Sequence, residues 1–78
     1  MNSKQLTAAL ASLLAANGAT VLAPGKRYEG KIDGCTVQAF GAGVVAPWMR
    51  AIEADGTAWQ AFISAKTGKL GKVARVPA

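Results

Sequence analysis

A chain of 78 residues forms one small domain, and a domain of that size buries only about 60% of its unfolded surface. Hydrophobic residues make up 51% of the sequence, which excludes a disordered tail, and nine Lys and Arg against four Asp and Glu leave a net charge of +5. There is no histidine and the only cysteine is Cys35, which excludes an internal disulfide, a Cys/His zinc site and a nucleophile–histidine pair within one chain. No apolar run approaches the roughly 20 residues that span a bilayer.

The first predicted element is a helix over residues 4–17. Asn2 or Ser3 can cap the first turn, and Asn17-Gly18 supplies a left-handed stop. Lys4 before an apolar stretch also resembles the start of a signal peptide, but helical spacing of the leucines favours a helix packed on a sheet. The leucines follow the i, i+4, i+7, i+8 pattern of one apolar stripe: Leu6, Leu10, Leu13 and Leu14.

A short β-type run over residues 19–23 is predicted next, ended by Pro24-Gly25 in a type II turn. A hairpin follows, with strands over 27–32 and 35–40 joined by a two-residue turn at Asp33-Gly34. Because side chains alternate across a strand, the hairpin has one polar and one apolar face. The apolar face holds Tyr28, Ile32, Cys35, Val37 and Ala39. The thiol of Cys35 is therefore predicted to be core packing rather than a nucleophile.

The second predicted hairpin is centred on Asp55-Gly56. An Asp-Gly pair between alternating runs is typical of a two-residue turn, which would pair Ile52 with Trp59 and Trp48 with Ile63. These four side chains would then share one face, because alternate residues of a strand point to the same side. Both tryptophans lie in this set, so the face is predicted to be the floor of the core.

A short helix over residues 48–54, beginning after Pro47, is the competing interpretation of the first strand. The hairpin is favoured because the run over 57–63 needs a strand partner. Gly41-Ala42-Gly43 is interpreted as a bulge or loop, and a final edge strand is predicted within residues 69–76. The predicted fold is α+β, with one N-terminal helix packed on one face of an antiparallel β meander of four to six strands. Residues 1–78 are predicted to form a single compact domain.

In this register Met49 and Phe62 face away from the tryptophans, and Phe40 lies on the corresponding side of its own hairpin. One helix covers only one side of a sheet, so these three side chains form either an exposed apolar patch or a cluster buried by a loop or the C-terminal segment. No acid follows Asp55 in the sequence. Basic residues are predicted to surround this patch, namely Arg50, Lys66, Lys69, Lys72 and Arg75.

The sequence contains no catalytic constellation, so an enzyme is not expected, and neither a cofactor nor a metal site is predicted. The first functional hypothesis is a cytoplasmic binding protein that docks on a larger protein or nucleoprotein complex, or forms a homodimer, through this patch and its basic rim. Small inhibitors of host machinery from phages and plasmids, anti-CRISPR proteins included, share this size and type, although no motif connects them. The alternative is a basic nucleic-acid-binding domain. A protein partner is favoured, because only Phe40 and Phe62 remain free to stack on bases.

Overall fold

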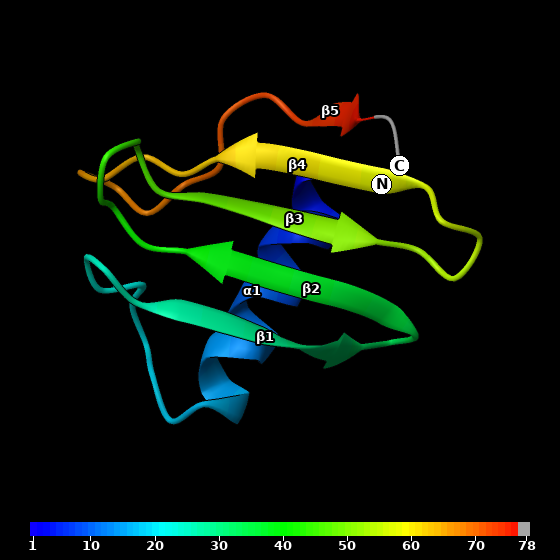
Figure 1. The fold of residues 1–78 in the computed structure, drawn as a ribbon, viewed down its shortest axis with the longest axis horizontal. Coiled ribbons are helices and arrows are strands. Elements are labelled where there is room, and N and C mark those ends of the chain that lie inside the picture. The colour runs from blue at the N-terminus through cyan, green and yellow to red at the C-terminus, as the bar shows by residue number, and fades with distance from the viewer. Residues whose placement is uncertain (77–78) are drawn as a thin grey trace.

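The computed structural model describes residues 1–76 as one helix behind a five-stranded antiparallel sheet (Figure 1). The strands lie in chain order, β1-β2-β3-β4-β5, so the sheet is a meander. This architecture confirms the predicted α+β fold. The elements are α1 (Ser3–Ala16), β1 (Arg27–Ile32), β2 (Cys35–Phe40), β3 (Trp48–Ile52), β4 (Ala58–Phe62) and β5 (Ala74–Val76).

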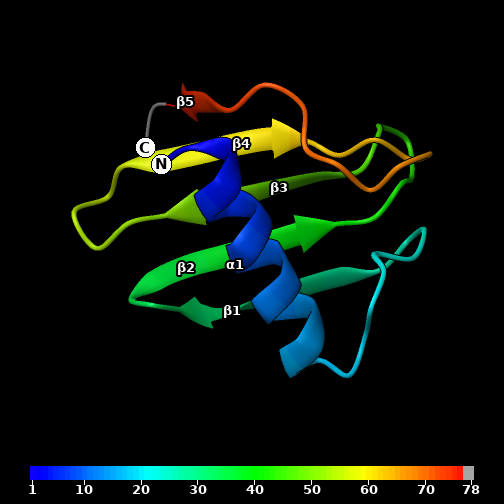
Figure 2. The same cartoon turned by 180° about the vertical axis from the view of Figure 1, so that it is seen from behind.

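Helix α1 begins with a capping box. The side chain of Asn2 accepts a hydrogen bond from the backbone N–H of Gln5 at 2.8 Å, and the Gln5 side chain accepts one from the Asn2 N–H at 2.9 Å. At the other end, Asn17 donates its side-chain amide to the carbonyl of Leu13 at 2.8 Å, and Gly18 adopts a φ of 70°. The helix crosses one face of the sheet diagonally (Figure 2). Among residues 1–76, no helix has the length and apolar character needed to cross a bilayer.

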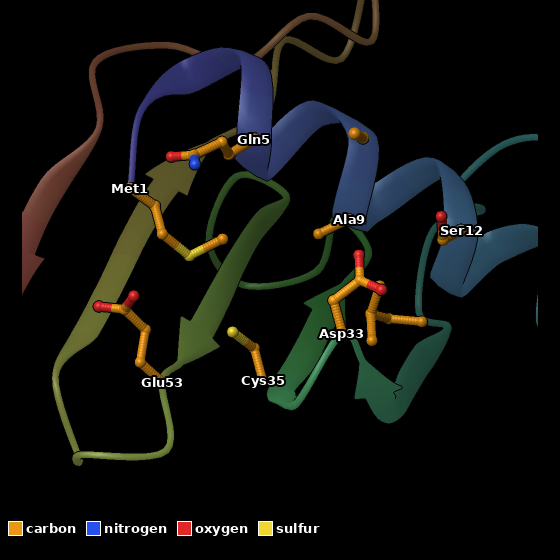
Figure 3. Close-up of a pocket in the computed structure, with 9 residues that line it drawn as sticks. Met1, Gln5, Ala9, Ser12, Asp33, Cys35 and Glu53 are labelled. Atoms are coloured by element: carbon orange, nitrogen blue, oxygen red, sulfur yellow. The ribbon is translucent and has the colours of Figure 1, made fainter.

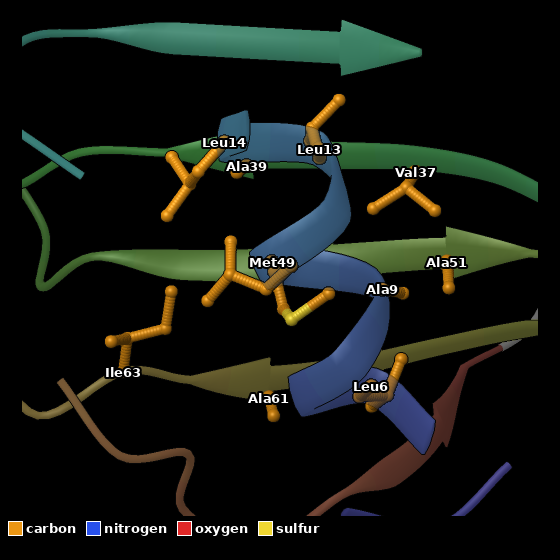
Figure 4. Packing of buried hydrophobic residues seen from close by; sticks show 11 residues of the cluster. Leu6, Ala9, Leu13, Leu14, Val37, Ala39, Met49, Ala51, Ala61 and Ile63 are labelled. Atoms are coloured by element: carbon orange, nitrogen blue, oxygen red, sulfur yellow. The ribbon is translucent and has the colours of Figure 1, made fainter. Parts of the chain in front are cut away.

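The core lies between α1 and the sheet face that it covers (Figure 4). The leucine stripe of the helix packs there against small and medium side chains of β2, β3 and β4. Alanines at the sheet surface let the helix approach closely, so the leucines supply most of the buried volume. The buried residues of this cluster are Leu6, Ala9, Leu10, Leu13, Leu14, Val37, Ala39, Met49, Ala51, Ala61 and Ile63.

The first hairpin has the predicted register. Ile32 pairs with Cys35 across a two-residue turn in which Asp33 and Gly34 have φ values of 50° and 81°, the left-handed conformation of a type I′ turn. The predicted apolar face is the one that packs towards α1. Cys35 itself is partly buried against the core cluster.

The second hairpin does not have the predicted register. The N–H of Gly56 donates to the carbonyl of Glu53 at 2.9 Å, and the N–H of Glu53 donates to the carbonyl of Thr57 at 2.8 Å, which makes Ala54-Asp55-Gly56 a three-residue loop. Gly56 has a φ of 90° and acts as the left-handed residue of a bulged turn. The Asp55 carboxylate accepts the Thr57 N–H at 2.9 Å, and this hydrogen bond lowers the pKa of Asp55.

One extra loop residue shifts the pairing by one position, which exchanges the two faces of a strand. Ala51, not Ile52, therefore pairs with Trp59, and Trp48 pairs with Phe62. The prediction that both tryptophans form the core floor is wrong. Trp59 packs against the core cluster, whereas Trp48 points to the opposite face of the sheet.

One further expectation is corrected before β1, and the predicted final edge strand is confirmed at the other side of the sheet. Residues 19–23 do not form a strand; they are a loop in which the side chain of Val21 is 70% exposed. The final strand, β5, is short and covers only Ala74–Val76, preceded by an isolated bridge between Ile63 and Leu70. In contrast, the helix alternative for residues 48–54 is excluded by the β3 ladder.

A backbone hydrogen bond connects the loop before β1 to the residue that follows β2: the N–H of Gly41 donates to the carbonyl of Lys26 at 2.7 Å. A Cβ atom on Gly41 would collide with the backbone carbonyl of Ala23 and lie 3.1 Å from the oxygen of Lys26. We therefore expect Gly41→Ala to lower the free energy of unfolding by about 1–3 kcal/mol, measured by urea denaturation. Gly43→Ala is the matched control, because a Cβ there meets nothing within 4 Å. Equal urea midpoints for the two variants would contradict this prediction.

Candidate binding face

Helix α1 covers one face of the sheet and leaves the other face open (Figures 1 and 2). The strand registers arrange the open-face side chains in rows that run across the strands. The first row, which we call the aromatic row, lies where β1 begins and β4 ends. It consists of Arg27, Phe40, Trp48 and Phe62. The second row, the polar row, consists of Glu29, Gln38, Arg50 and Gln60.

The rings of Phe40 and Trp48 stack on each other, with centroids 4.2 Å apart and planes inclined by 15°. Neighbouring strands are only about 5 Å apart, so two parallel rings at this distance stand upright on the sheet with their faces together. Each ring also makes a cation–π interaction with an arginine. Arg27 Cζ lies 5.0 Å from the Phe40 centroid, and Arg50 Cζ lies 5.2 Å from the Trp48 centroid. Phe62 ends the row and is 57% exposed. The row is thus a preformed stack with a free ring beside it.

The polar row is held together by side-chain hydrogen bonds of unequal strength. Gln38 Nε2 donates to Glu29 Oε1 at 2.7 Å, whereas Arg50 Nη2 donates to Gln60 Oε1 at a long 3.4 Å. Arg50 Nε is buried and has no hydrogen-bond partner among the described residues. Arg50 therefore has donor capacity that the protein itself leaves unused.

Positive charge gathers at the end of the sheet that carries the aromatic row, which we call the loop end. The connections before β1, between β2 and β3, and after β4 all meet there (Figure 1). Its cations are Lys26, Arg27, Lys66, Lys69 and Lys72. The four acidic residues of the chain lie elsewhere. Glu29 is in the middle of β1, and Asp33, Glu53 and Asp55 lie in the turns at the opposite end.

The structure brings together part of the predicted partner-binding set. Phe40, Phe62 and Arg50 share the open face. Met49 does not, because it is fully buried beneath α1, and the register shift gives its expected position to Trp48. The sequence offered one signal for this exchange, since an Asp-Gly pair also fits a three-residue bulged loop.

The C-terminal basic residues do not act as one group in the fold. Lys66 and Lys69 belong to the loop after β4, at the loop end. Lys72 lies in the segment that leads to β5, and Arg75 pairs with Trp59, on the side of the sheet that α1 covers. Lys72 follows Gly71, whose N–H donates to the carbonyl of Phe62 at 2.8 Å, so Lys72 also lies near the end of β4 and Arg75 alone is remote from the aromatic row.

A pocket of about 330 Å³ lies on the opposite side of the sheet, beside α1 (Figure 3). Cys35, Asp33 and Glu53 face it from the turn end, and Met1 and Gln5 close it from the helix. The Glu53 carboxylate already accepts the indole N–H of Trp59 at 2.9 Å. Among residues 1–76, no three His, Cys, Asp or Glu side chains form a group that could hold a metal ion. We assign no chemistry to this pocket.

A second pocket, of about 440 Å³, opens at the loop end between the last turns of α1 and the segment after β4. Leu10, Leu14 and Ile63, which belong to the core cluster, line it together with Lys66. Its lining contains no acid–base pair, so it offers shape and one positive charge rather than a reactive group.

Comparison of the chain with models of protein families, with curated proteins and with solved structures found no match.

Proposed function

We propose that this protein binds single-stranded nucleic acid on the open face of its sheet. The observation that carries this proposal is the Phe40–Trp48 stack, braced by two arginines at the end of the sheet where no acid lies. Base–aromatic stacking combined with a positively charged surface is how proteins commonly hold single strands without strong sequence preference. Both components are present on one face here.

The aromatic row offers bases two places to stack. One is beyond Arg27, whose guanidinium covers Phe40 and can itself stack on a base. The other is beside Phe62, the most exposed ring of the row. Because the rings of Phe40 and Trp48 already support each other, they lose little further side-chain freedom when a base arrives.

Charge at the loop end complements the phosphates of a strand that lies along the aromatic row. Lys26 precedes β1 at one side of the row, and Lys66 and Lys69 follow β4 at the other side. A strand crossing from β1 to β4 would therefore meet cations at both ends of the stack. The acids at the opposite end of the sheet would repel a strand that lay along the turns.

The register of the second hairpin is the reason for preferring nucleic acid to a protein partner. The sequence favoured a protein because both tryptophans were expected in the core, which left few rings for bases. With Trp48 on the open face, three aromatic rings stand in one row between cations. That reason for preferring a protein is removed.

A protein partner remains the second candidate because of one observation at the loop end. The side chains of Val44 and Val45, in the loop between β2 and β3, are 107% and 58% exposed. Exposed apolar residues next to an aromatic ring and basic side chains are common at docking surfaces. In this alternative the protein would occupy an acidic surface of a larger partner, as a small inhibitor of host machinery does.

Trp48→Ala should weaken binding to a fluorescein-labelled oligothymidylate of about 12 nucleotides, a length within the site sizes of small single-strand-binding domains. Trp48 supports both the Phe40 ring and the Arg50 guanidinium, so we expect its loss to cost as much as one base–aromatic stack, about 1–3 kcal/mol, or roughly 5- to 150-fold in Kd. Fluorescence anisotropy at about 50 mM salt measures the change. Trp59→Phe is the matched control, because Trp59 lies on the helix side and should leave Kd unchanged.

The control variant also provides a second readout. In Trp59→Phe the only remaining tryptophan is Trp48, so its emission should be quenched as the oligonucleotide binds. Duplex DNA of the same length should bind more weakly, because its bases are not free to stack. Absence of oligonucleotide binding at low salt, or equal Kd values for wild type and Trp48→Ala, would refute the proposed function and favour a protein partner.

A further inference from the structure

From the polar row we infer that Arg50 gives the open face a preference for guanine. This inference rests on the proposed function, since it concerns bases stacked on the aromatic row. Arg50 follows Trp48 by two residues on β3, so it lies about 7 Å further along the same face. A base stacked on the aromatic row would therefore turn one edge towards the polar row.

The guanidinium of Arg50 can donate further hydrogen bonds to an acceptor on a ligand. Its guanidinium is held over the Trp48 ring at 5.2 Å and by one long hydrogen bond to Gln60 at 3.4 Å. Its Nε, buried and without a partner, is a donor that costs stability until an acceptor reaches it. A small rotation of the guanidinium on the ring would bring Nε and Nη2 to one ligand edge together. An edge with two neighbouring acceptors would satisfy both donors.

Among the Hoogsteen edges of the four bases, that of guanine has two neighbouring acceptors. Its O6 and N7 are adjacent acceptors, whereas the same edge of adenine has one acceptor and one donor. Thymine offers a single carbonyl there and cytosine offers a donor. A phosphate could also accept hydrogen bonds from the Arg50 guanidinium. The cations proposed to bind phosphates, however, lie at the loop end rather than in the polar row: Lys26, Lys66 and Lys69. Arg50 itself pairs with Gln38 on one side and Gln60 on the other, away from those cations.

Five labelled oligonucleotides test this inference on the wild-type protein. All are oligothymidylates of about 12 nucleotides, and four carry one central substitution: guanine, hypoxanthine, 7-deazaguanine or adenine. Hypoxanthine keeps both O6 and N7, while 7-deazaguanine lacks N7. We expect guanine and hypoxanthine to lower Kd by roughly 5- to 100-fold relative to adenine and 7-deazaguanine.

Arg50→Lys separates base reading from charge. Lysine keeps the positive charge but lacks the planar guanidinium, so the ratio of Kd values between the adenine and guanine oligonucleotides should fall close to one in the variant, whatever affinity it loses for plain oligothymidylate. Equal loss of affinity for all five oligonucleotides would show that Arg50 only braces Trp48, and would overturn the inference. So would a wild-type protein that binds 7-deazaguanine as tightly as guanine.

The experiment distinguishes the two levels of the proposal. Binding of plain oligothymidylate without any guanine preference would overturn the role of Arg50 and leave single-strand binding intact. Failure to bind any of the five oligonucleotides would overturn the proposed function itself, and the guanine preference with it.

Discussion

Met49→Ala should lower the free energy of unfolding by about 2–5 kcal/mol, because it removes a fully buried side chain and leaves a cavity in the core. Met49 lies on β3 where the strand faces α1, in contact with the leucine stripe (Figure 4). Domains of this length have only about 4–12 kcal/mol of stability in total. The variant should therefore unfold at a markedly lower urea concentration, followed by circular dichroism.

Trp48→Ala is the matched control, since Trp48 is the neighbouring residue on the same strand and points to the open face. Its ring is only partly buried, so its removal should cost less stability than the loss of Met49. The register predicted from the sequence reverses this order, with Trp48 in the core and Met49 on the surface. A larger loss of stability in Trp48→Ala than in Met49→Ala would show that the three-residue loop is not formed.

Most of the fold was predictable because its local signals agree with one another. The leucine spacing of α1, its Asn2 cap and the type I′ turn at Asp33-Gly34 each indicate one structure, and each is found. The run over residues 19–23 has β-type composition but no ladder partner in the structure. Composition could not show that absence, because pairing depends on residues far away in the chain.

The composition of the open face was only partly predictable, because the loop at Gly56 is ambiguous in the sequence. The sequence Asp55-Gly56 fits both a two-residue turn and a three-residue loop, and the choice between them decides which residues of β3 share a face with which residues of β4. Phe40 was assigned correctly because its hairpin has an unambiguous turn. The predicted faces of Trp48 and Met49 were exchanged because the turn of their hairpin is ambiguous in the sequence.

The loop-end cations should determine how binding depends on salt. We expect Lys26, Lys66 and Lys69, replaced together by alanine, to reduce the slope of log Kobs against log salt by about 2, because each phosphate contact on a single strand contributes about 0.7. Affinity at about 50 mM salt should fall at least tenfold. Anisotropy titrations with labelled oligothymidylate across a salt series measure both quantities.

Lys4, Lys31 and Arg75, replaced together by alanine, form the control, because this variant loses the same charge from positions away from the loop end. Its slope should stay within about 0.7 of the wild-type value, the contribution of one contact. An equal loss in the two variants would mean that net charge attracts the strand without a defined path. A difference confined to the loop-end variant would instead indicate that the phosphates follow the aromatic row across the strands, since Lys26 and Lys69 lie at opposite sides of that row.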